Sequence, residues 1–457
     1  MSVIGPAWLQ QDVLYKEIED RHQKANEIVD FCTWIYFRDS VSDSFFLFRG
    51  LKSWMPDSWV QAVNDRQTLY LSWEERHYMI AQTLFNAALK MGGLPLKAMQ
   101  MVSLRDDLPL AYREVFRAAQ ESTDFRSPAD HVEGILKSLQ PHLTNVSLEP
   151  IKSASIAQVH AGLWEGSPCI LKIQHPHIKA VYKADLQIMV ELADKVNAAK
   201  EGVGASVMLR AVAAKLEPMI DEETDFMKEA ENQCRAKANF VENQSIVVAK
   251  VYRSDQMFLL MEKLEGITGA EAEARWAVGD AVDVFGPAQR TVLYEAYAEM
   301  LFKHRFLQAD AHPGNFLALP SGQVGLLDFG QTTEINPQTH ERFLSFAKNA
   351  PRKPVDPDDH QSLMSLKTWL IGVGVEVENG LQAQRFAEIF FYGGDGTIFA
   401  EAKSIDPATV AALIVVMYLS RFENTANRTR ARLGMTDAPS PRTSEVLEAW
   451  RRVADLF

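Results

Sequence analysis

The stretch Gln308-Ala-Asp-Ala-His-Pro-Gly-Asn315, with Asp328-Phe-Gly330 shortly after it, decides the fold. Two short apolar runs, residues 316–319 and 324–327, lie between these segments and are separated by Pro320-Ser-Gly-Gln323. Apolar runs that are bounded by turn residues predict a β-hairpin. Because a hairpin returns the chain to the edge from which it started, we expect the two acidic segments to lie side by side.

The residue types in these segments are those that phosphoryl transfer requires. Mg²⁺ prefers oxygen ligands from one or two carboxylates, together with the phosphates themselves. We therefore expect Asn315 and Asp328 to hold the metal and Asp310 to orient the attacking nucleophile. The alternative is a surface hairpin flanked by solvated carboxylates and capping residues.

Composition limits the class of protein. The chain has 457 residues, 47% hydrophobic and 23% charged, which is typical of a soluble globular protein with two or three cores. The net charge of −13, without a Lys/Arg block, argues against a nucleic-acid partner. Cys32, Cys169 and Cys234 lie far apart, so we expect no disulfide framework, no disulfide-linked partner and no zinc site. The most apolar run, residues 410–419, is too short to span a bilayer and predicts a buried helix.

The N-terminal part has a mostly helical pattern over residues 1–80, with many aromatic residues between positions 31 and 59. Such a stripe is able to rest on a membrane interface, and ordinary core packing is the alternative. The N-terminus has no secretory apolar region, and its acidic residues do not suit a transit peptide. A helix is predicted to break at Gly92-Gly93-Leu-Pro95 and to resume through residues 96–105. Taken alone, Lys97 would extend to solvent.

Alternating residues 156–164, a Glu165-Gly-Ser-Pro168 turn and residues 169–174 predict a β-hairpin with Lys172 inside an apolar strand. A buried ammonium group is costly unless it is paired. Lys172 therefore either faces solvent or meets carboxylates and phosphates. Its place before an acidic helix and before the Asp310 segment is that of the kinase lysine that contacts the α- and β-phosphates.

A long helical stretch is predicted over residues 178–243, with Asp225 and Glu229 on one helical face. Acidic clusters of this kind are also common on solvated faces. Two strands, residues 246–252 and 257–263, are expected to close an antiparallel sheet.

The second of these strands contains Glu262, and the chain leaves it through Glu265-Gly266, where a kinase hinge would hold adenine. A helix predicted over residues 291–306 leads into the Asp310 loop. After Glu334 the pattern is helical to the end of the sequence.

Taken in order, these motifs resemble the UbiB family of aarF-domain atypical kinases over roughly residues 85–335. The segments that carry the resemblance are the alanine-rich nucleotide loop at 150–160, the lysine strand at 170–174, the ExD motif Glu223-Thr-Asp225, the helix-C glutamate Glu229, the catalytic loop at 309–315, the metal loop at 327–330, and the KxGQ helix at Lys97-Ala-Met-Gln100 followed by residues 104–109.

The chain departs from the family pattern at a few positions. Met99 stands where the KxGQ motif has glycine. Lys152 and Ser153 replace alanines at the start of the nucleotide loop. Gln308 stands where many members have histidine, a variation that resembles the mitochondrial branch of the family.

The resemblance implies an α+β, protein-kinase-like bilobal fold, with a small antiparallel sheet in the N-lobe, a mainly helical C-lobe and a helical N-terminal extension. Residues 1–84 would form the extension, and residues 85–145 a KxGQ-like helical segment that covers the active site. Residues 146–266 would form the N-lobe with inserted helices, and residues 267–457 the C-lobe with a helical C-terminal region.

The resemblance also implies the cofactors ATP and Mg²⁺ and a role for each site residue. The implied catalytic residues are Asp310, Lys172 and Glu229: Lys172, paired with Glu229, would position the phosphates, and Asp310 would orient a hydroxyl or water. The residues implied in nucleotide binding are Lys172, Ser153, Ala154, Ser155, Glu262, Lys97, Gln100, Glu223 and Asp225, and those implied in metal binding are Asn315 and Asp328.

The implied function is that of an ATP-dependent atypical kinase or ATPase in isoprenoid quinone or related lipid metabolism, acting on a quinone precursor or lipid with peripheral contact to a membrane. The implied location is a mitochondrion or plastid for a eukaryotic chain, and the cytoplasm or inner-membrane periphery for a bacterial one. A true protein or small-molecule kinase and a nucleotide-binding pseudokinase scaffold are the alternatives. The arginines of residues 428–432 would contact anionic headgroups or form a solvated helix end.

Overall fold

The computed structural model describes residues 14, 16–28, 72–102, 110–117, 126–197, 203–279, 284–349, 359–372, 375, 407–432 and 443–457. The aromatic-rich section at residues 31–59 lies outside them. The chain divides into two compact units: unit 1 is Met1–Phe226 with Ser254–Leu260, and unit 2 is Met227–Arg253 with Met261–Phe457. Both helices and sheets are present, as the α+β prediction requires. The four-part division drawn from the sequence stays a prediction.

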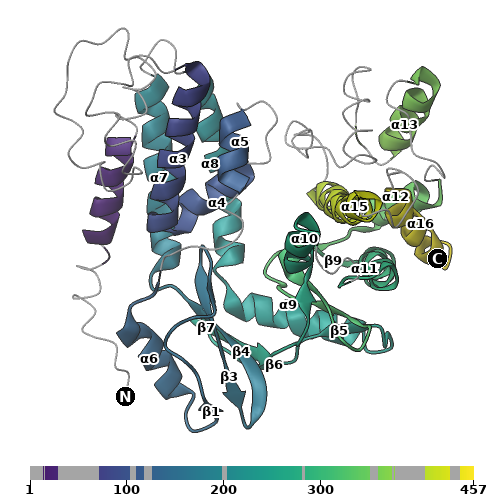
Figure 1. The fold of residues 1–457 in the computed structure, drawn as a ribbon, viewed down its shortest axis with the longest axis horizontal. Helices are drawn as coiled ribbons and strands as arrows, with labels where there is room; N and C mark the ends of the chain where they lie inside the picture. Colours follow the sequence, from purple (N-terminus) through teal and green to yellow (C-terminus); the bar gives the residue numbers. More distant parts are fainter. Residues whose placement is uncertain are drawn as a thin grey trace. The chain divides into compact units, whose positions relative to one another are not determined.

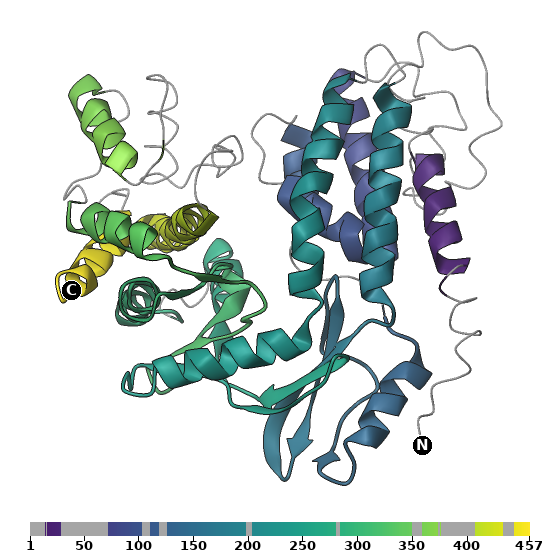
Figure 2. The same cartoon turned by 180° about the vertical axis from the view of Figure 1, so that it is seen from behind.

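Unit 1 contains a group of long helices whose apolar faces share one core (Figures 1 and 2). The helices α7 and α8 lie side by side in both views. Met99, the departure from the KxGQ motif, packs half-buried against this core. The helices of unit 1 are residues 16–28, α3 (Trp73–Met91), α4 (Gly93–Val102), α5 (Leu110–Arg117), α6 (Ala129–Ser138), α7 (Ile178–Asn197) and α8 (Val203–Glu223).

The predicted helix break in unit 1 is confirmed between α3 and α4. A capping box, formed by Ser72 and Glu75, starts α3. Gly92 and Gly93 end it, with φ angles of 60° and 65° that favour glycine. A Cβ atom on Gly93 would lie 3.0 Å from the guanidinium of Arg21, so this turn also has little room for a side chain.

A buried ion pair joins residues 16–28 to α7. Arg21 Nε donates to Asp185 Oδ1 at 2.6 Å, and Arg21 Nη1 donates to the Met91 carbonyl at 2.7 Å. Both charged side chains are almost completely buried. Removing either partner would leave an uncompensated charge in the core, so this pair fixes the α3–α4 turn against α7.

The strands of a curled sheet lie in the spatial order β1-β3-β4-β7-β6, with β2 paired to β3. The hairpin predicted around Glu165-Gly-Ser-Pro168 is confirmed, with Val159 opposite Lys172 in its antiparallel register. The strands of this sheet are β1 (Leu143–Thr144), β2 (Lys152–Ser153), β3 (Ala157–Trp164), β4 (Ser167–Gln174), β6 (Val251–Ser254) and β7 (Phe258–Glu262).

Unit 2 contains a second sheet, in the order β5-β11-β10-β8. The predicted hairpin is confirmed, because β10 and β11 are antiparallel with Phe316 opposite Leu326. Gly325 faces Leu317 across this pairing, and a Cβ there would lie 3.1 Å from Leu264. The strands of unit 2 outside the first sheet are β5 (Ile246–Val248), β8 (Ile267–Thr268), β9 (Phe306–Gln308), β10 (Phe316–Ala318), β11 (Val324–Leu326) and β12 (Thr332–Glu334).

Two element predictions in this region are wrong. The strand expected over residues 246–252 is two strands in different sheets, because β5 pairs in parallel with β11 while β6 joins the first sheet. The helix expected to reach residue 306 ends earlier. A π-turn at Met300–His304 is followed by Arg305 in a left-handed conformation, φ 50°, and β9 then begins.

The helices of unit 2 enclose its core. The run predicted to be a buried helix is confirmed within α15, where Leu413, Val415 and Leu419 are fully buried. The helices of this unit are α9 (Phe226–Asn239), α10 (Gly269–Ala277), α11 (Pro287–Glu299), α12 (Pro337–Lys348), α13 (His360–Gly372), α15 (Pro407–Arg432) and α16 (Thr443–Ala454).

A buried charge cluster joins α11 to α15 in this core. Arg290 Nε donates to Glu423 Oε2 at 2.6 Å, and the hydroxyl of Tyr294 donates to the same oxygen at 2.5 Å. Burial would raise the pKa of Glu423, but the adjacent Arg290 guanidinium holds it below its ordinary value. The carboxylate is therefore charged and paired inside the protein.

Replacing Glu423 by glutamine is expected to lower the free energy of unfolding of unit 2 by about 3 kcal/mol, because Arg290 would keep a buried charge without its counterion. Urea denaturation measures this change. The control is Arg452→Gln, which breaks a half-exposed pair with Glu295 and should cost less than about 1 kcal/mol. Equal losses in the two variants would contradict the role assigned to burial.

Candidate functional site

Unit 2 brings the two acidic segments together through the β10–β11 hairpin. The backbone N–H of Leu327 donates to the carbonyl of Asn315 at 2.8 Å, at the open end of the hairpin. On the other side, the N–H of Ala309 donates to the carbonyl of Gln331 at 3.0 Å. The loops at residues 309–315 and 327–331 are thus fixed to each other by backbone hydrogen bonds.

Asn315 and Asp310 are in direct contact within the first loop. The amide nitrogen of Asn315 donates to the Asp310 carbonyl at 3.0 Å and to its carboxylate at 3.2 Å. Because the nitrogen is engaged in this way, the amide oxygen is the atom of Asn315 that is placed to ligate a cation. Both side chains are half-buried, so solvent and a ligand can reach them.

Asp328 has a left-handed backbone conformation, with φ 56°. Its Oδ1 atom accepts the N–H of Gly330 at 3.1 Å. Non-glycine residues rarely adopt this conformation, and it persists where the surroundings hold it in place, often at functional sites. The carboxylate of Asp328 is therefore presented by a backbone geometry that the neighbouring structure must maintain.

Gln308 supplies part of that support from β9, where it is fully buried. Its amide nitrogen donates to the carbonyls of Leu327 and Asp328, and its amide oxygen accepts the hydroxyl of Tyr297 at 2.5 Å. Burial raises the pKa of Tyr297 well above its ordinary value, and the charge of Asp310 adds to this. The hydroxyl therefore stays protonated and acts as a donor.

Sequence reasoning identified Gln308 only as a departure from a family pattern, and it missed Tyr297. It also missed Tyr418 of α15, whose ring lies 6.3 Å from that of His312 in an edge-to-face arrangement. Burial raises the pKa of Tyr418, and the charge of Asp310 adds to the rise. Tyr418 belongs to a helix far from the loop in sequence, Tyr297 belongs to the helix that precedes β9, and no local motif marks either residue.

The helix α9 supports the metal loop from another direction. Asn232 donates to the carbonyl of Phe329 at 3.0 Å. Glu229 is 3% exposed, and a Cβ atom on Gly330 would lie 3.8 Å from its carboxylate. Asp225 precedes the first residue of α9, so the prediction that it shares a helical face with Glu229 is wrong.

In unit 1, Lys97 of α4 forms an ion pair with Glu223 at the end of α8. Its ammonium nitrogen lies 2.7 Å from Glu223 Oε1, and the two side chains are 19% and 9% exposed. Lys97 therefore does not extend freely to solvent, as it would if it were an isolated surface lysine. Gln100 lies on the same helix, and its side chain is outside the described atoms.

Lys172 lies in β4, on the strand face opposite the buried Leu171 and Ile173, and is itself half-buried. Its ammonium group lies 5.3 Å from the centre of the Phe226 ring, a distance at which a cation interacts favourably with an aromatic face.

Ser153 ends β2, and Ala154 and Ser155 begin the loop between β2 and β3. Ser153 is buried, and the N–H of Ala154 donates to the Ala157 carbonyl at 2.8 Å, which closes a tight turn. Ala154 and Ser155 remain accessible at the tip. This exposed backbone is the part of the loop that a phosphate would approach.

His175 holds this loop in place through hydrogen bonds to Ala154 and Ser127. Its Nε2 atom lies 3.1 Å from the Ala154 carbonyl, to which it donates, and its Nδ1 atom accepts the hydroxyl of Ser127 at 2.7 Å. Burial lowers the pKa of His175 to about 4, although the hydrogen bond to Ala154 opposes this change. The imidazole is therefore neutral at pH 7, which suits one donor and one acceptor nitrogen.

Glu262 ends β7 in unit 2, and its carboxylate accepts the N–H of Lys250 at 3.0 Å. The predicted exit at Gly266 is closely packed, because a Cβ there would lie 2.6 Å from the carbonyl oxygen of Ala318. The side chain of Glu262 thus links the end of β7 to the residue that precedes β6, and its part in nucleotide binding stays a prediction.

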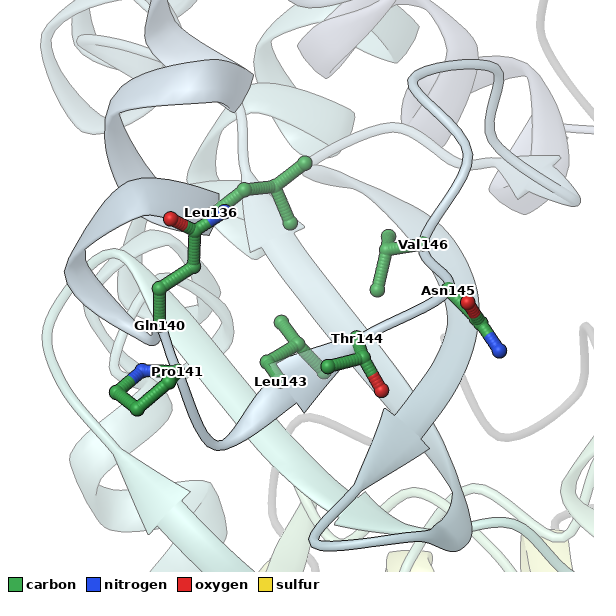
Figure 3. Close-up of a pocket in the computed structure, with 7 residues that line it drawn as sticks. All are labelled: Leu136, Gln140, Pro141, Leu143, Thr144, Asn145 and Val146. Carbon is green, nitrogen blue, oxygen red and sulfur yellow. The ribbon is translucent and has the colours of Figure 1, made fainter.

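A surface hollow of about 440 Å³ lies beside α6 and β1, and none of the predicted site residues lines it (Figure 3). Among the residues that the structure describes, no group of three or more His, Cys, Asp or Glu side chains is placed to hold a metal ion. A magnesium ion at Asn315 and Asp328 would therefore take its remaining ligands from phosphates and water, as this ion commonly does. Cys169 and Cys234 are free thiols.

Comparison with known proteins identifies the class. Residues 132–355 match the ABC1 atypical kinase-like domain and belong to that family. The mixed fold, with its curled antiparallel sheet and mostly helical remainder, is the kinase-like fold that the sequence predicted. None of the described helices has the length and apolar character needed to cross a membrane.

Similar proteins include ACTIVITY OF BC1 COMPLEX KINASE 8, chloroplastic, from Arabidopsis thaliana, 26% identical over 81% of this chain and 46% of its own length. Another is the probable protein kinase UbiB of Pectobacterium carotovorum, 26% identical over 63% of this chain and 55% of its own. The chain thus spans about half the length of these curated relatives. The Rv3197–erythromycin complex of Mycobacterium tuberculosis aligns over 84% of this chain and all of its own, with 20% identity and a TM-score of 0.43, which is too low to carry an argument.

His175 predicts how the stability of unit 1 depends on pH. An unfolded histidine binds a proton near pH 6.5, while the native one does so near 4, so the free energy of unfolding should fall by about 2 kcal/mol between pH 7 and pH 5 through this residue. His175→Gln should remove this part of the pH dependence, because glutamine does not titrate. Urea denaturation at both pH values measures it, and an unchanged pH dependence in the variant would contradict the prediction.

Proposed function

We propose that this protein is an ATP-dependent atypical kinase or ATPase that binds Mg–ATP and acts in isoprenoid quinone or related lipid metabolism. The observation that carries the catalytic part is the fixed arrangement of the loops at residues 309–315 and 327–331 in unit 2. In the proposal, this arrangement would offer the amide oxygen of Asn315 and the carboxylate of Asp328 as ligands, with the carboxylate of Asp310 hydrogen-bonded to Asn315. This donor set suits magnesium on a triphosphate.

Each residue has a distinct part in the proposal. Asn315 and Asp328 would hold magnesium, which neutralises charge on the phosphates when it is bound. Asp310, already hydrogen-bonded to Asn315, would orient the attacking hydroxyl or water through its carboxylate. Lys172 would contact the α- and β-phosphates, and Glu229 would pair with it.

The remaining proposed contacts lie in unit 1, except for Glu262 of unit 2. Ser153, Ala154 and Ser155 would approach the phosphates through the turn that His175 fixes. Glu223 would do so together with Lys97, with which it forms an ion pair, and Asp225 and Gln100 are further proposed contacts. Glu262 would accompany the adenine-binding segment.

The lipid or quinone substrate rests on the resemblance to the UbiB family and on the relatives that carry that name. The alternatives use the same nucleotide contacts. A true protein or small-molecule kinase would transfer the phosphoryl group to an acceptor, and a pseudokinase scaffold would bind the nucleotide without transferring it. Transfer of label from ATP to an acceptor, faster than phosphate release, would favour the first. Nucleotide binding without turnover in the presence of lipid vesicles would favour the second.

Replacing Asp328 by asparagine is expected to lower Mg²⁺-dependent ATP turnover by about a hundredfold or more, because the metal loses its charged ligand. Phosphate release during a magnesium titration measures this loss. Asp359→Asn is the matched control: Asp359 is exposed and caps α13, and asparagine caps helices equally well. Turnover by Asp328→Asn at the wild-type rate would refute the metal role.

A further inference from the structure

The metal loop of unit 2 depends on two buried side chains that have no assigned function. Asp328 has a left-handed backbone conformation. The carbonyl before its amide nitrogen, that of Leu327, and its own carbonyl both accept a hydrogen bond from Gln308. A backbone that is held by two donors from one rigid group cannot rotate without breaking both contacts. The side chain of Gln308 is 0% exposed, so water is not available to replace them.

An amide can serve this purpose only in one orientation. Its nitrogen end must face the two carbonyls, since its oxygen end would face two further oxygens. The hydroxyl of Tyr297 donates to the amide oxygen at 2.5 Å, and this contact stabilises the orientation that the loop requires. Tyr297 is itself fully buried in α11, the helix that precedes β9.

We infer that Tyr297 and Gln308 together act as positioning residues, which hold the backbone of residues 327–330 so that the Asp328 carboxylate is ready to bind magnesium. The inference deepens the proposed function. Its statement about magnesium binding rests on that function, and its statement about the loop backbone does not. Neither side chain contacts substrate; both act through the backbone of Asp328.

The chain offers a matched control on the same helix. Tyr294 lies one turn before Tyr297 and is equally buried, and its hydroxyl donates to Glu423 rather than to the metal loop. Tyr294→Phe and Tyr297→Phe therefore delete the same atom from the same core. Only the second deletion removes the partner of Gln308.

Hydrogen exchange of the ligand-free protein tests the positioning directly. The amides of Leu327 and Gly330 report on the loop, because they donate to Asn315 and to the Asp328 carboxylate. Tyr297→Phe should speed their exchange by about fivefold, as expected for the loss of one hydrogen bond, and Tyr294→Phe should leave it unchanged. Equal effects in the two variants, or none in Tyr297→Phe, would overturn the inference.

A second experiment measures how tightly the protein binds magnesium together with ADP. In Tyr297→Phe, the Mg²⁺ concentration that gives half-maximal Mg-dependent binding of ADP should rise by about fivefold, while ADP binding in EDTA stays at the wild-type level. A general loss of structure would weaken both. If wild-type protein binds no Mg–ADP, the proposed function fails, and the exchange experiment still decides whether the loop is held in this way.

Gln308 itself provides the rescue experiment. Gln308→Met keeps the length of the side chain without its donors and should speed exchange at least as much as Tyr297→Phe does. Gln308→His should restore slow exchange, because an imidazole N–H is able to donate to the Asp328 carbonyl. In the Gln308→Met background, Tyr297→Phe should add nothing, since the amide that it orients is gone. An additive effect there would show that Tyr297 acts by another route.

Discussion

The antiparallel pairing of Phe316 with Leu326 is the constraint on which the candidate site depends. This register determines that Asn315 and Leu327 meet at the open end of the hairpin, with the N–H of one bonded to the carbonyl of the other. A slip of one residue would turn every side chain of β11 to the opposite face and separate the two loops. The small Gly325 helps to exclude such a slip, because a side chain at this position would meet Leu264 and Leu317.

Much of this local architecture could be predicted from sequence. The two hairpins, the break at Gly92 and Gly93 and the buried helix around residue 415 all follow from short-range patterns, namely alternation, turn residues and apolar runs. The predictions that failed concern pairing over longer distances. Nothing in residues 246–252 indicates that the first half pairs in parallel with β11, a partner that lies about eighty residues further along the chain.

The candidate site likewise contains residues that the sequence predicts and residues that only the fold reveals. Its carboxylates and lysines were identified because their types and order are recognisable in a single sequence. The groups that hold them were not, since Tyr297, Asn232 and Tyr418 act across the core from separate helices. Each looks like an ordinary helical residue until the fold places its polar atom against a loop. A polar group buried in this way must find a partner, and the partner is determined by tertiary structure alone.

The glutamine at position 308 shows why a single position can mislead. Compared alone with the histidine that many UbiB-family members carry, it is a departure and suggests a weakened site. An imidazole, however, titrates near neutral pH and offers one N–H to the loop in its neutral form, whereas an amide does not titrate and offers two. The two carbonyls require one orientation of this amide, and the hydrogen bond from Tyr297 stabilises it. Gln308 and Tyr297 are therefore best regarded as one unit, and the departure at position 308 is no evidence against a functional metal loop.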